Sequence, residues 1–173
     1  MLGINAGSGQ RPFKSFPEEG IQWINIDGNP RWNPDIVADI RDLSMFGDSM
    51  VDLVVLHHVW EHFGLGEGDG MIRECHRILK PRGSLLVCIP NPRALCQRYL
   101  SGEIDEYIFN VNMYGAYMGD EADRHKWSMS PTACVEALRR LADWHDVHAF
   151  NGRTIPGADI ARDWWTTEIE AVK

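Results

Sequence analysis

The sequence has no long apolar run and no cysteine pair. Its apolar runs stop well short of the roughly 20 residues that span a bilayer, and no signal peptide pattern is present. The four cysteines, Cys75, Cys88, Cys96 and Cys134, show no C-x-x-C spacing. We therefore expect no transmembrane segment, no disulfide framework, and reduced thiols in a cytoplasmic protein.

Basic charge is also scarce. The chain carries 17 Lys and Arg against 25 Asp and Glu, a formal net charge of −8. Because nucleic acids and anionic membranes attract basic surfaces, this balance disfavours both as partners. With 173 residues, 44% of them hydrophobic, the chain is long enough for one core, so we expect a single domain over residues 1–173.

The first apolar segment, residues 2–6, runs directly into the turn Gly7-Ser8-Gly9. An apolar run that ends in Gly-x-Gly is typical of a buried strand and a turn whose backbone approaches a ligand, because glycine has no Cβ. The same pattern also occurs in plain strand-to-helix connections. The turn is therefore a candidate cofactor cradle that needs support from the rest of the chain.

An acidic residue at a suitable distance gives that support. Residues 21–27 alternate apolar and polar side chains and end at Asp27, before a Gly-Asn-Pro turn, as expected for a second strand. Asp27 follows Gly7 by 20 residues, the spacing at which a carboxylate accepts hydrogen bonds from ribose in nucleoside-binding α/β folds. The third run, residues 36–40, contains Asp39, which would either hold an adenine amine or cap the next turn.

The remaining pattern alternates strands and helices. Strand patterns cover residues 51–56, 84–89, 144–150 and 164–172. Helical patterns begin at Asp69 and after the Ser130-Pro131 cap. Pro12 and Pro17 predict a short or irregular first crossover. This order predicts an α/β fold with a mostly parallel sheet.

Residues 93–129 show no clear periodicity but are rich in aromatic side chains. These are Tyr99, Tyr107, Phe109, Tyr114, Tyr117 and Trp127. A long aromatic excursion in a compact domain is often functional, so we expect a lid or a substrate-side insertion here.

A dense set of titratable side chains follows the strand at 51–56, namely His57, His58, Glu61 and His62. Catalytic and ligand-binding groups of open α/β sheets collect at the carboxyl ends of the strands. Histidine titrates near neutral pH and suits proton removal, although a structural hydrogen-bonding role is the alternative for each of these residues.

In their order along the chain these motifs resemble the class I S-adenosylmethionine-dependent methyltransferases, in particular small members with a Glu-His pair after the fourth strand. The resemblance spans residues 2–92 and is carried by residues 4–9, 25–27, 37–43, 51–55 with 61–63, and 74–84. Weaker similarities follow at residues 125–128 and at Arg162-Asp163-Trp164.

The resemblance implies a Rossmann-like sheet of seven strands, mostly parallel, with helices on both faces and the last strand antiparallel. It implies S-adenosyl-L-methionine as the cofactor and methyl transfer to a small-molecule or protein acceptor. The candidate bases are His58 and His125. The implied cofactor-binding residues are Asn5, Gly7, Gly9, Asp27, Gly28, Asp39, Ile40 and His57.

Two departures from the family pattern matter. Asn5 stands where the first motif commonly has an acidic residue, which affects how the methionine ammonium is anchored. The chain also starts at the first strand, without the helices that usually precede it. We therefore expect a more open cofactor site, or one completed by a partner subunit in a homodimer.

Two other functions compete with methyl transfer. A catalytically inactive module that binds the cofactor or a partner would carry the same motifs. The run from His58 to His62 also satisfies H-x-x-E-H, the zinc pattern of inverted zincins, but we identify no third ligand and assign no metal-binding residue.

A nicotinamide dehydrogenase is disfavoured because Pro12 replaces the third glycine of G-x-G-x-x-G. A DNA amine methyltransferase would need an Asn-Pro-Pro-Tyr type motif where residues 57–60 stand.

Overall fold

The computed structural model describes residues 1–16, 18, 20–116, 120–158, 160 and 164–173. Its strands are β1 (Leu2–Ala6), β2 (Gln22–Asp27), β3 (Ile36–Val37), β4 (Val51–His57), β5 (Leu79–Pro90), β6 (Asp146–Ala149) and β7 (Thr166–Val172). Its helices are α1 (Asp69–Ile78), α2 (Pro92–Leu100), α3 (Glu106–Tyr114) and α4 (Pro131–Leu141), with short 3-10 helices η2 (Pro30–Trp32), η3 (Trp60–His62) and η4 (Glu121–Asp123). None of the helices described is long and apolar enough to cross a membrane.

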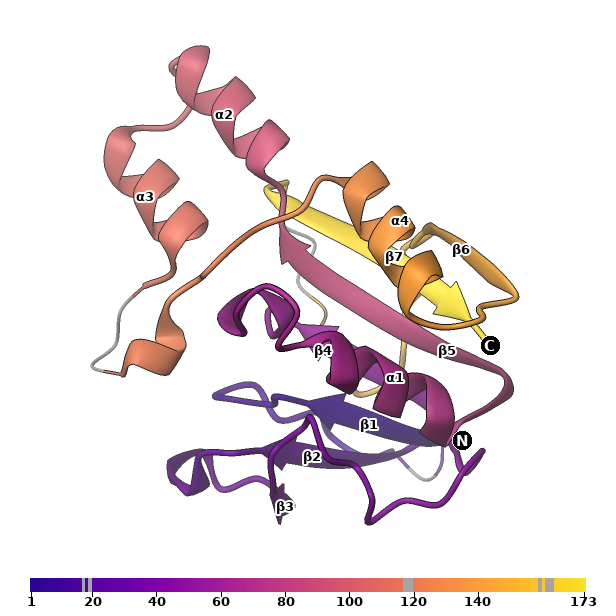
Figure 1. Ribbon diagram of the computed structural model, residues 1–173. Helices are drawn as coiled ribbons and strands as arrows, with labels where there is room; N and C mark the ends of the chain where they lie inside the picture. The colour runs from indigo at the N-terminus through magenta and orange to yellow at the C-terminus, as the bar shows by residue number, and fades with distance from the viewer. Residues whose placement is uncertain (17, 19, 117–119, 159, 161–163) are drawn as a thin grey trace.

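The seven strands form one sheet in the order β3-β2-β1-β4-β5-β7-β6 (Figure 1). The pairs from β3 to β5 are parallel, and β7 is antiparallel to both of its neighbours. This confirms the predicted α/β class, the strand number and the antiparallel last strand. Strands β2 and β3 lie on one side of β1, and strands β4 and β5 lie on the other, so the strand order switches between β1 and β4. In open α/β sheets ligands bind beyond the carboxyl ends of the strands at such a switch point.

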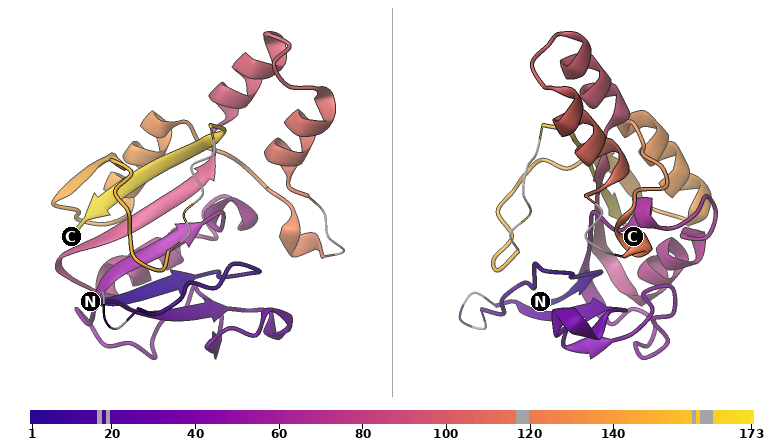
Figure 2. Two further views of the ribbon diagram at one scale, coloured as in Figure 1. Left: turned by 180° about the vertical axis from the view of Figure 1, so that it is seen from behind. Right: turned by 90° about the vertical axis from the view of Figure 1, so that its left-hand side faces the viewer.

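The two faces of the sheet are covered differently. Helices α1 and α4 pack on one face, where the larger hydrophobic core lies (Figures 1 and 2). On the other face, described loop residues such as Phe13 and Ile155 cover Trp23 and Leu53. The expectation of helices on both faces therefore differs from the described structure. The physical reason includes Pro12, because a proline so close to β1 leaves no room for a long first crossover helix.

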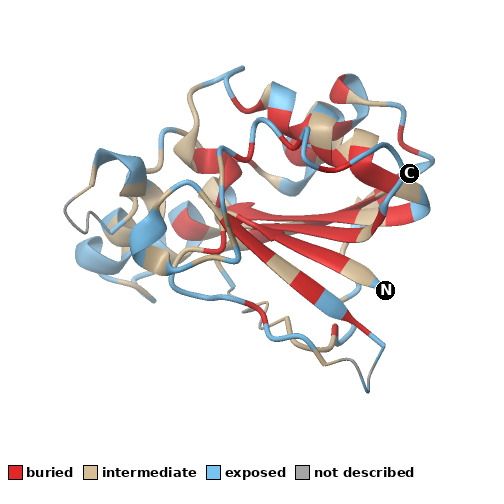
Figure 3. Cartoon of the chain, turned by 90° about the horizontal axis from the view of Figure 1, so that it is seen from below, coloured by how far each residue is buried: buried red, intermediate tan, exposed pale blue. Residues whose placement is uncertain are grey.

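The central strands are buried on both faces, and Figure 3 shows buried residues running along them. In β4 the residues from Leu53 to Leu56 are all buried, which explains the continuous apolar run in the sequence. Strand β5 begins at Leu79, five residues before the predicted Ser84, because residues 80–83 bulge out between its first and second pairings with β4. A Cβ on Gly83 would lie 2.9 Å from the Lys80 carbonyl oxygen, so the bulge favours glycine.

The predicted irregular excursion contains two helices. Helices α2 and α3 project beyond the carboxyl end of β5, away from the sheet (Figure 1). The cue for α2 lies in the sequence, since Asn91 accepts hydrogen bonds from the amides of Arg93 and Ala94 as an N-cap and Pro92 occupies the first turn. Tyr117, one of the aromatic residues of the excursion, lies outside the described residues.

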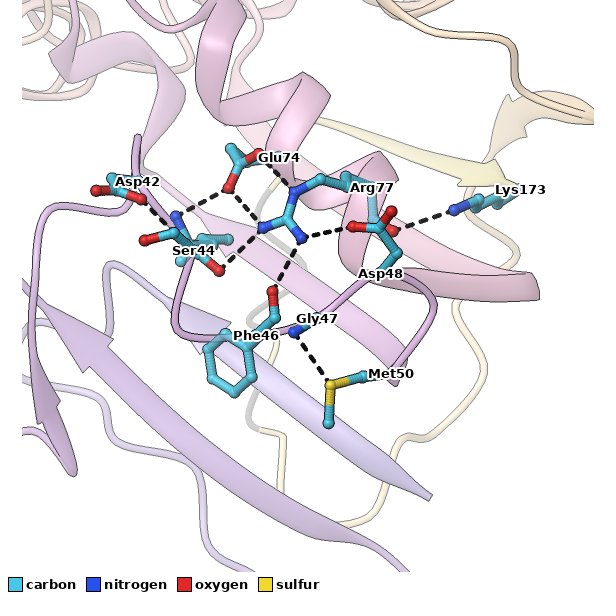
Figure 4. Close-up of polar contacts among 10 residues, drawn as sticks. Asp42, Ser44, Phe46, Gly47, Asp48, Met50, Glu74, Arg77 and Lys173 are labelled. Atoms are coloured by element: carbon cyan, nitrogen blue, oxygen red, sulfur yellow. Dashed lines mark hydrogen bonds and ion pairs between the residues drawn. The ribbon is translucent and has the colours of Figure 1, made fainter.

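Arg77 on α1 fastens the long connection between β3 and β4 to the helix (Figure 4). Its guanidinium donates to both carboxylate oxygens of Glu74 at 2.7 and 2.8 Å, and to the carbonyl oxygens of Leu43 and Phe46 at 3.1 and 2.9 Å. Glu74 in turn accepts from the Leu43 amide at 3.1 Å. The hydrogen bond from Arg77 holds the pKa of Glu74 below its usual value. The fork therefore anchors the connection that also carries Asp39.

Replacing Arg77 with lysine should destabilise the fold although the charge is kept. Lysine cannot reproduce the planar fork, so Arg77→Lys loses bonds to two carbonyls and one carboxylate oxygen. We expect a loss of about 2 kcal/mol in the free energy of unfolding, measured by denaturant titration. Arg73→Lys on the exposed side of the same helix is the control and should change stability by less than about 0.5 kcal/mol. Equal stabilities of the two variants would contradict the anchoring role.

Candidate functional site

The glycine turn and Asp27 meet directly at the edge of the sheet. The Asp27 carboxylate accepts hydrogen bonds from the Gly9 amide and the Asn29 amide, each at 2.8 Å. The amides of Gly7 and Ser8 donate to the Ile26 carbonyl oxygen at 2.8 and 3.0 Å. The turn after β1 is therefore bound to the end of β2, as the spacing in the sequence indicates.

Both glycines of the turn adopt a left-handed backbone, with φ of +76° at Gly7 and +47° at Gly9. At Gly7 an added Cβ would lie 2.6 Å from Cγ2 of Val59, so the site has no space for a side chain. At Gly9 an added Cβ would meet nothing within 4 Å. Gly7 thus lets the turn pack against the segment after β4, whereas Gly9 faces open space.

A cavity of about 800 Å³ opens beside this turn. Its size lies within the roughly 300–1,000 Å³ that is usual for small-molecule sites. The predicted site residues that line it are Gly7, Gly9, Asp27, Gly28, Asp39, Ile40 and His58. Residues that the sequence analysis did not name also contribute, among them Trp32, Arg41, Phe63 and Asp123.

A second cavity of about 410 Å³ adjoins the first at the glycine turn. The predicted site residues that line it are Asn5, Gly7, Gly9, His57, His58 and His125. Its walls also include Phe13 and Trp165. The two cavities share six lining residues, so all the residues assigned from the sequence border two adjoining cavities. The shared residues are Gly7, Gly9, Trp32, His58, His62 and Asp123.

Asn5 is buried, with 2% of its surface exposed, and ties the turn to the sheet. Its Nδ2 donates to the Arg11 carbonyl oxygen at 3.1 Å and to Asn25 Oδ1 at 3.0 Å. Asn25 Oδ1 also accepts from the Phe13 amide at 2.7 Å. The side-chain amide at position 5 therefore organises the loop after the glycine turn, a role that needs a donor and that a carboxylate could not fill.

Strand β3 ends at Val37, whereas the apolar run in the sequence continues to residue 40. Asp39 therefore lies beyond the strand. Its carboxylate forms a two-pronged ion pair with Arg41, with a shortest distance of 2.6 Å. The hydrogen bond from Arg41 lowers the pKa of Asp39. Both side chains are about half exposed and both line the larger cavity, so this pair presents a neutralised polar edge.

The histidine cluster is built around Glu61, which is completely buried. His58 has a left-handed backbone with φ of +57°, and its Nδ1 lies 2.8 Å from Glu61 Oε1. His125 Nε2 lies 3.9 Å from the same oxygen. Burial raises the pKa of Glu61 to about 7, partly offset by His62 and His125. Burial likewise lowers the pKa of His125.

The structure brings both candidate bases together across 67 residues of sequence. His125 is held in place because the Lys126 amide donates to the Glu61 carbonyl oxygen at 2.7 Å and Trp127 Nε1 donates to the Phe63 carbonyl oxygen at 2.8 Å. Trp165, which the sequence analysis missed, stacks on the His58 ring with centroids 4.7 Å apart. Arg162 and Asp163, named with Trp164 as a weaker similarity, lie outside the described residues.

The arrangement expected of an inverted zincin is absent from the described residues. Residues 60–62 form a single 3-10 turn, and the left-handed His58 precedes it, so the two histidines of the motif do not share a face of an α-helix. The described groups with ligand geometry are instead Glu61, His62 and His125, whose ligand atoms lie within 4.8 Å of one another.

Comparisons with known proteins agree with this fold. A family model described as "Methyltransferase domain" matches residues 5–87. A SAM-dependent methyltransferase from Archaeoglobus fulgidus superposes with a TM-score of 0.64 at 18% identity, covering 99% of this chain and 86% of that chain. No match was found among curated proteins.

Two further solved structures have the same fold. The 1,6-didemethyltoxoflavin-N1-methyltransferase of Burkholderia thailandensis, solved with 1,6-didemethyltoxoflavin and S-adenosylhomocysteine, gives a TM-score of 0.58 at 14% identity, with 99% of this chain and 70% of that chain covered. A SAM-dependent methyltransferase from Methanosarcina mazei gives 0.55 at 17% identity, with 99% and 90% covered. At these identities the likeness concerns the fold.

The two glycines of the turn should differ in their tolerance of a side chain. Gly7→Ala introduces both left-handed strain and a clash with Val59, so we expect a loss of about 2–4 kcal/mol in the free energy of unfolding. Gly9→Ala introduces strain alone and should lose about 1 kcal/mol. Denaturant unfolding of both variants measures the difference.

A double variant tests the cause of the Gly7 effect. Adding Val59→Ala to Gly7→Ala should make the pair less destabilising than the sum of the single changes, because the clash is removed. Simple additivity would show that Val59 is not what excludes a side chain at position 7.

Proposed function

We propose that the chain is a class I S-adenosylmethionine-dependent methyltransferase that transfers the methyl group to a small-molecule or protein acceptor, on the support of the methyltransferase family model that matches residues 5–87. The observation that carries the proposal is the contact between Asp27 and the Gly9 amide, both of which line the larger cavity. A carboxylate in that position can accept hydrogen bonds from ribose hydroxyls while the glycine backbone leaves space for the rest of the nucleoside.

We assign the lining residues to the parts of the cofactor as a proposal. We propose that Ile40 and Asp39 flank the adenine, that Asp27 and Gly28 hold the ribose, and that the methionine portion extends along Gly7 and Gly9. Asn5 and His57 line the smaller cavity, on the side where the methionine portion would end. The residues present fit the group, since the larger cavity combines an apolar wall with a carboxylate at its mouth.

The chemistry asks little of the protein beyond alignment. S-adenosylmethionine supplies a methyl group on a positively charged sulfur, which is already a good electrophile. The chain must place the acceptor lone pair in line with that methyl group and exclude water, and such alignment supplies most of the acceleration. We propose that the acceptor approaches from the smaller cavity, where His57, His125 and Trp165 form the walls.

A base is required only for an acceptor that arrives protonated. His58 and His125 are the candidates, and they differ in position. His58 lines both cavities and so borders the place where cofactor and acceptor would meet, whereas His125 lines the smaller cavity alone. An acceptor with a free lone pair at neutral pH would need neither residue.

Substitution of Asp27 tests the cofactor assignment. Asp27→Ala removes the proposed ribose contact, so S-adenosylhomocysteine should bind about 1–3 kcal/mol more weakly, or roughly 5- to 150-fold, in calorimetric titration. Asp143→Ala, on an exposed carboxylate that lines neither cavity, is the matched control and should bind like the unmodified protein. Unchanged affinity of the Asp27 variant would remove the residue from the site.

Binding and turnover separate the enzyme from the inactive module. The enzyme should release S-adenosylhomocysteine from S-adenosylmethionine in the presence of some members of a panel of amine, hydroxyl and thiol acceptors. Tight cofactor binding without release for any acceptor class would favour the module.

A further inference from the structure

Glu61, His62 and His125 form a compact group of potential metal ligands next to the proposed acceptor cavity. One ligand atom from each residue lies within 4.8 Å of those of the other two. Glu61 and His62 come from η3, which directly follows β4, and His125 comes from the segment after η4. Glu61 is completely buried and the His125 side chain is 9% exposed. Such a group is distinct from the acidic surface clusters that are common without a metal.

Three atoms of this group are buried without a hydrogen-bond partner in the part of the chain that the structure describes. They are Glu61 Oε2, His62 Nδ1 and His125 Nδ1. Most buried polar side-chain atoms of native proteins are paired, so three in one place require an explanation. Neither of the ion pairs found for Glu61 among the described residues involves Lys or Arg. A bound cation would satisfy the carboxylate and both imidazoles together.

We propose that Glu61, His62 and His125 bind a divalent transition-metal ion, with zinc as the best match to the ligand set. Two histidines and one glutamate are a zinc set that keeps a coordination position open. Ligand distances of about 2.0–2.2 Å in a tetrahedral site place ligand atoms roughly 3.3–3.6 Å apart. The ligand atoms of the three residues lie within 4.8 Å of one another, so each pair would have to approach by no more than about 1.5 Å to reach that spacing.

Neighbouring contacts support the site in the way that metal ligands usually require. His58 Nδ1 lies 2.8 Å from Glu61 Oε1, which orients the carboxylate toward the two histidines. The Lys126 amide, adjacent to His125, donates to the Glu61 carbonyl oxygen at 2.7 Å. The His62 and His125 rings meet edge to face with centroids 5.0 Å apart. Outer contacts of this kind fix ligand orientation and raise metal affinity.

The open coordination position would face the smaller cavity, because His62 and His125 both line it while Glu61 does not. This part of the inference rests on the proposed function. An oxygen of the acceptor, such as a hydroxyl or carboxylate, could occupy that position and be held beside the glycine turn. The substrate class would then be small molecules with an oxygen donor near the methylated atom.

Calorimetric titration of the chelator-treated full chain with zinc chloride tests the site, with magnesium chloride in parallel. We expect one zinc ion per chain and much weaker magnesium binding, because magnesium prefers oxygen ligands. His62→Gln and His125→Gln should each reduce zinc affinity by more than about 100-fold, since loss even of an outer contact typically costs 10–100-fold. Circular dichroism of both variants should match that of the unmodified protein.

Two control variants exclude adventitious binding. His145→Gln alters an exposed histidine outside the group, and Cys96→Ser removes the exposed thiol. Both should keep zinc affinity within about twofold of the unmodified chain. The proposal is overturned if zinc does not bind, if the His62 and His125 variants bind as well as the unmodified chain, or if either control abolishes binding.

The same chelator-treated sample separates this proposal from the proposed function. S-adenosylhomocysteine is titrated into it without added metal. Binding of S-adenosylhomocysteine together with failure of zinc rejects the metal site alone. Zinc binding that depends on His62 and His125, together with failure of S-adenosylhomocysteine, rejects the cofactor assignment and supports the metal site.

Discussion

The Asp27 carboxylate is the contact on which the arrangement of the site depends. Strands β1 and β2 are parallel and in register from Leu2 with Gln22 to Ala6 with Ile26, so both end at the same edge of the sheet. One carboxylate can therefore accept from the Gly9 amide after β1 and from the Asn29 amide after β2. Bonds from backbone amides to an ionised group are stronger than neutral ones, and here all three residues line the larger cavity.

The fold was predictable where local patterns determine it. The continuous apolar run of β4 and the alternation of β2 specify strands, and their order specifies a parallel sheet. The covering of the second face was not predictable, because contacts such as Trp23 Nε1 with the Pro156 carbonyl oxygen at 2.8 Å join segments 133 residues apart. Helix α2 was missed for another reason, since residues 93–129 show no clear periodicity and the helix is marked mainly by the Asn91 cap and by Pro92 in its first turn.

The site residues likewise include some that local sequence patterns predict and others that depend on long-range contacts. Part of the lining of the larger cavity follows from spacing within the first three strands, where the parallel register brings regularly spaced turns together; these residues are Gly7, Gly9, Asp27, Gly28, Asp39 and Ile40. His125 and Trp165 depend on long-range packing. His125 reaches Glu61 through the Lys126 and Trp127 hydrogen bonds, and Trp165 reaches His58 because β7 returns antiparallel along β5. No local pattern encodes those distances.

Burial of Glu61 connects the fold to the chemistry. Removing a carboxylate from water is expensive unless it is paired, and Glu61 has only histidines as ionic neighbours among the described residues. Transfer of a methyl group from a sulfonium depends mainly on alignment, so that reaction alone gives no reason to retain such a group. A group retained at this energetic cost is better explained by something that it binds or orients. Its neighbours His62 and His125 both line the smaller cavity, which is why we propose an ion at this group.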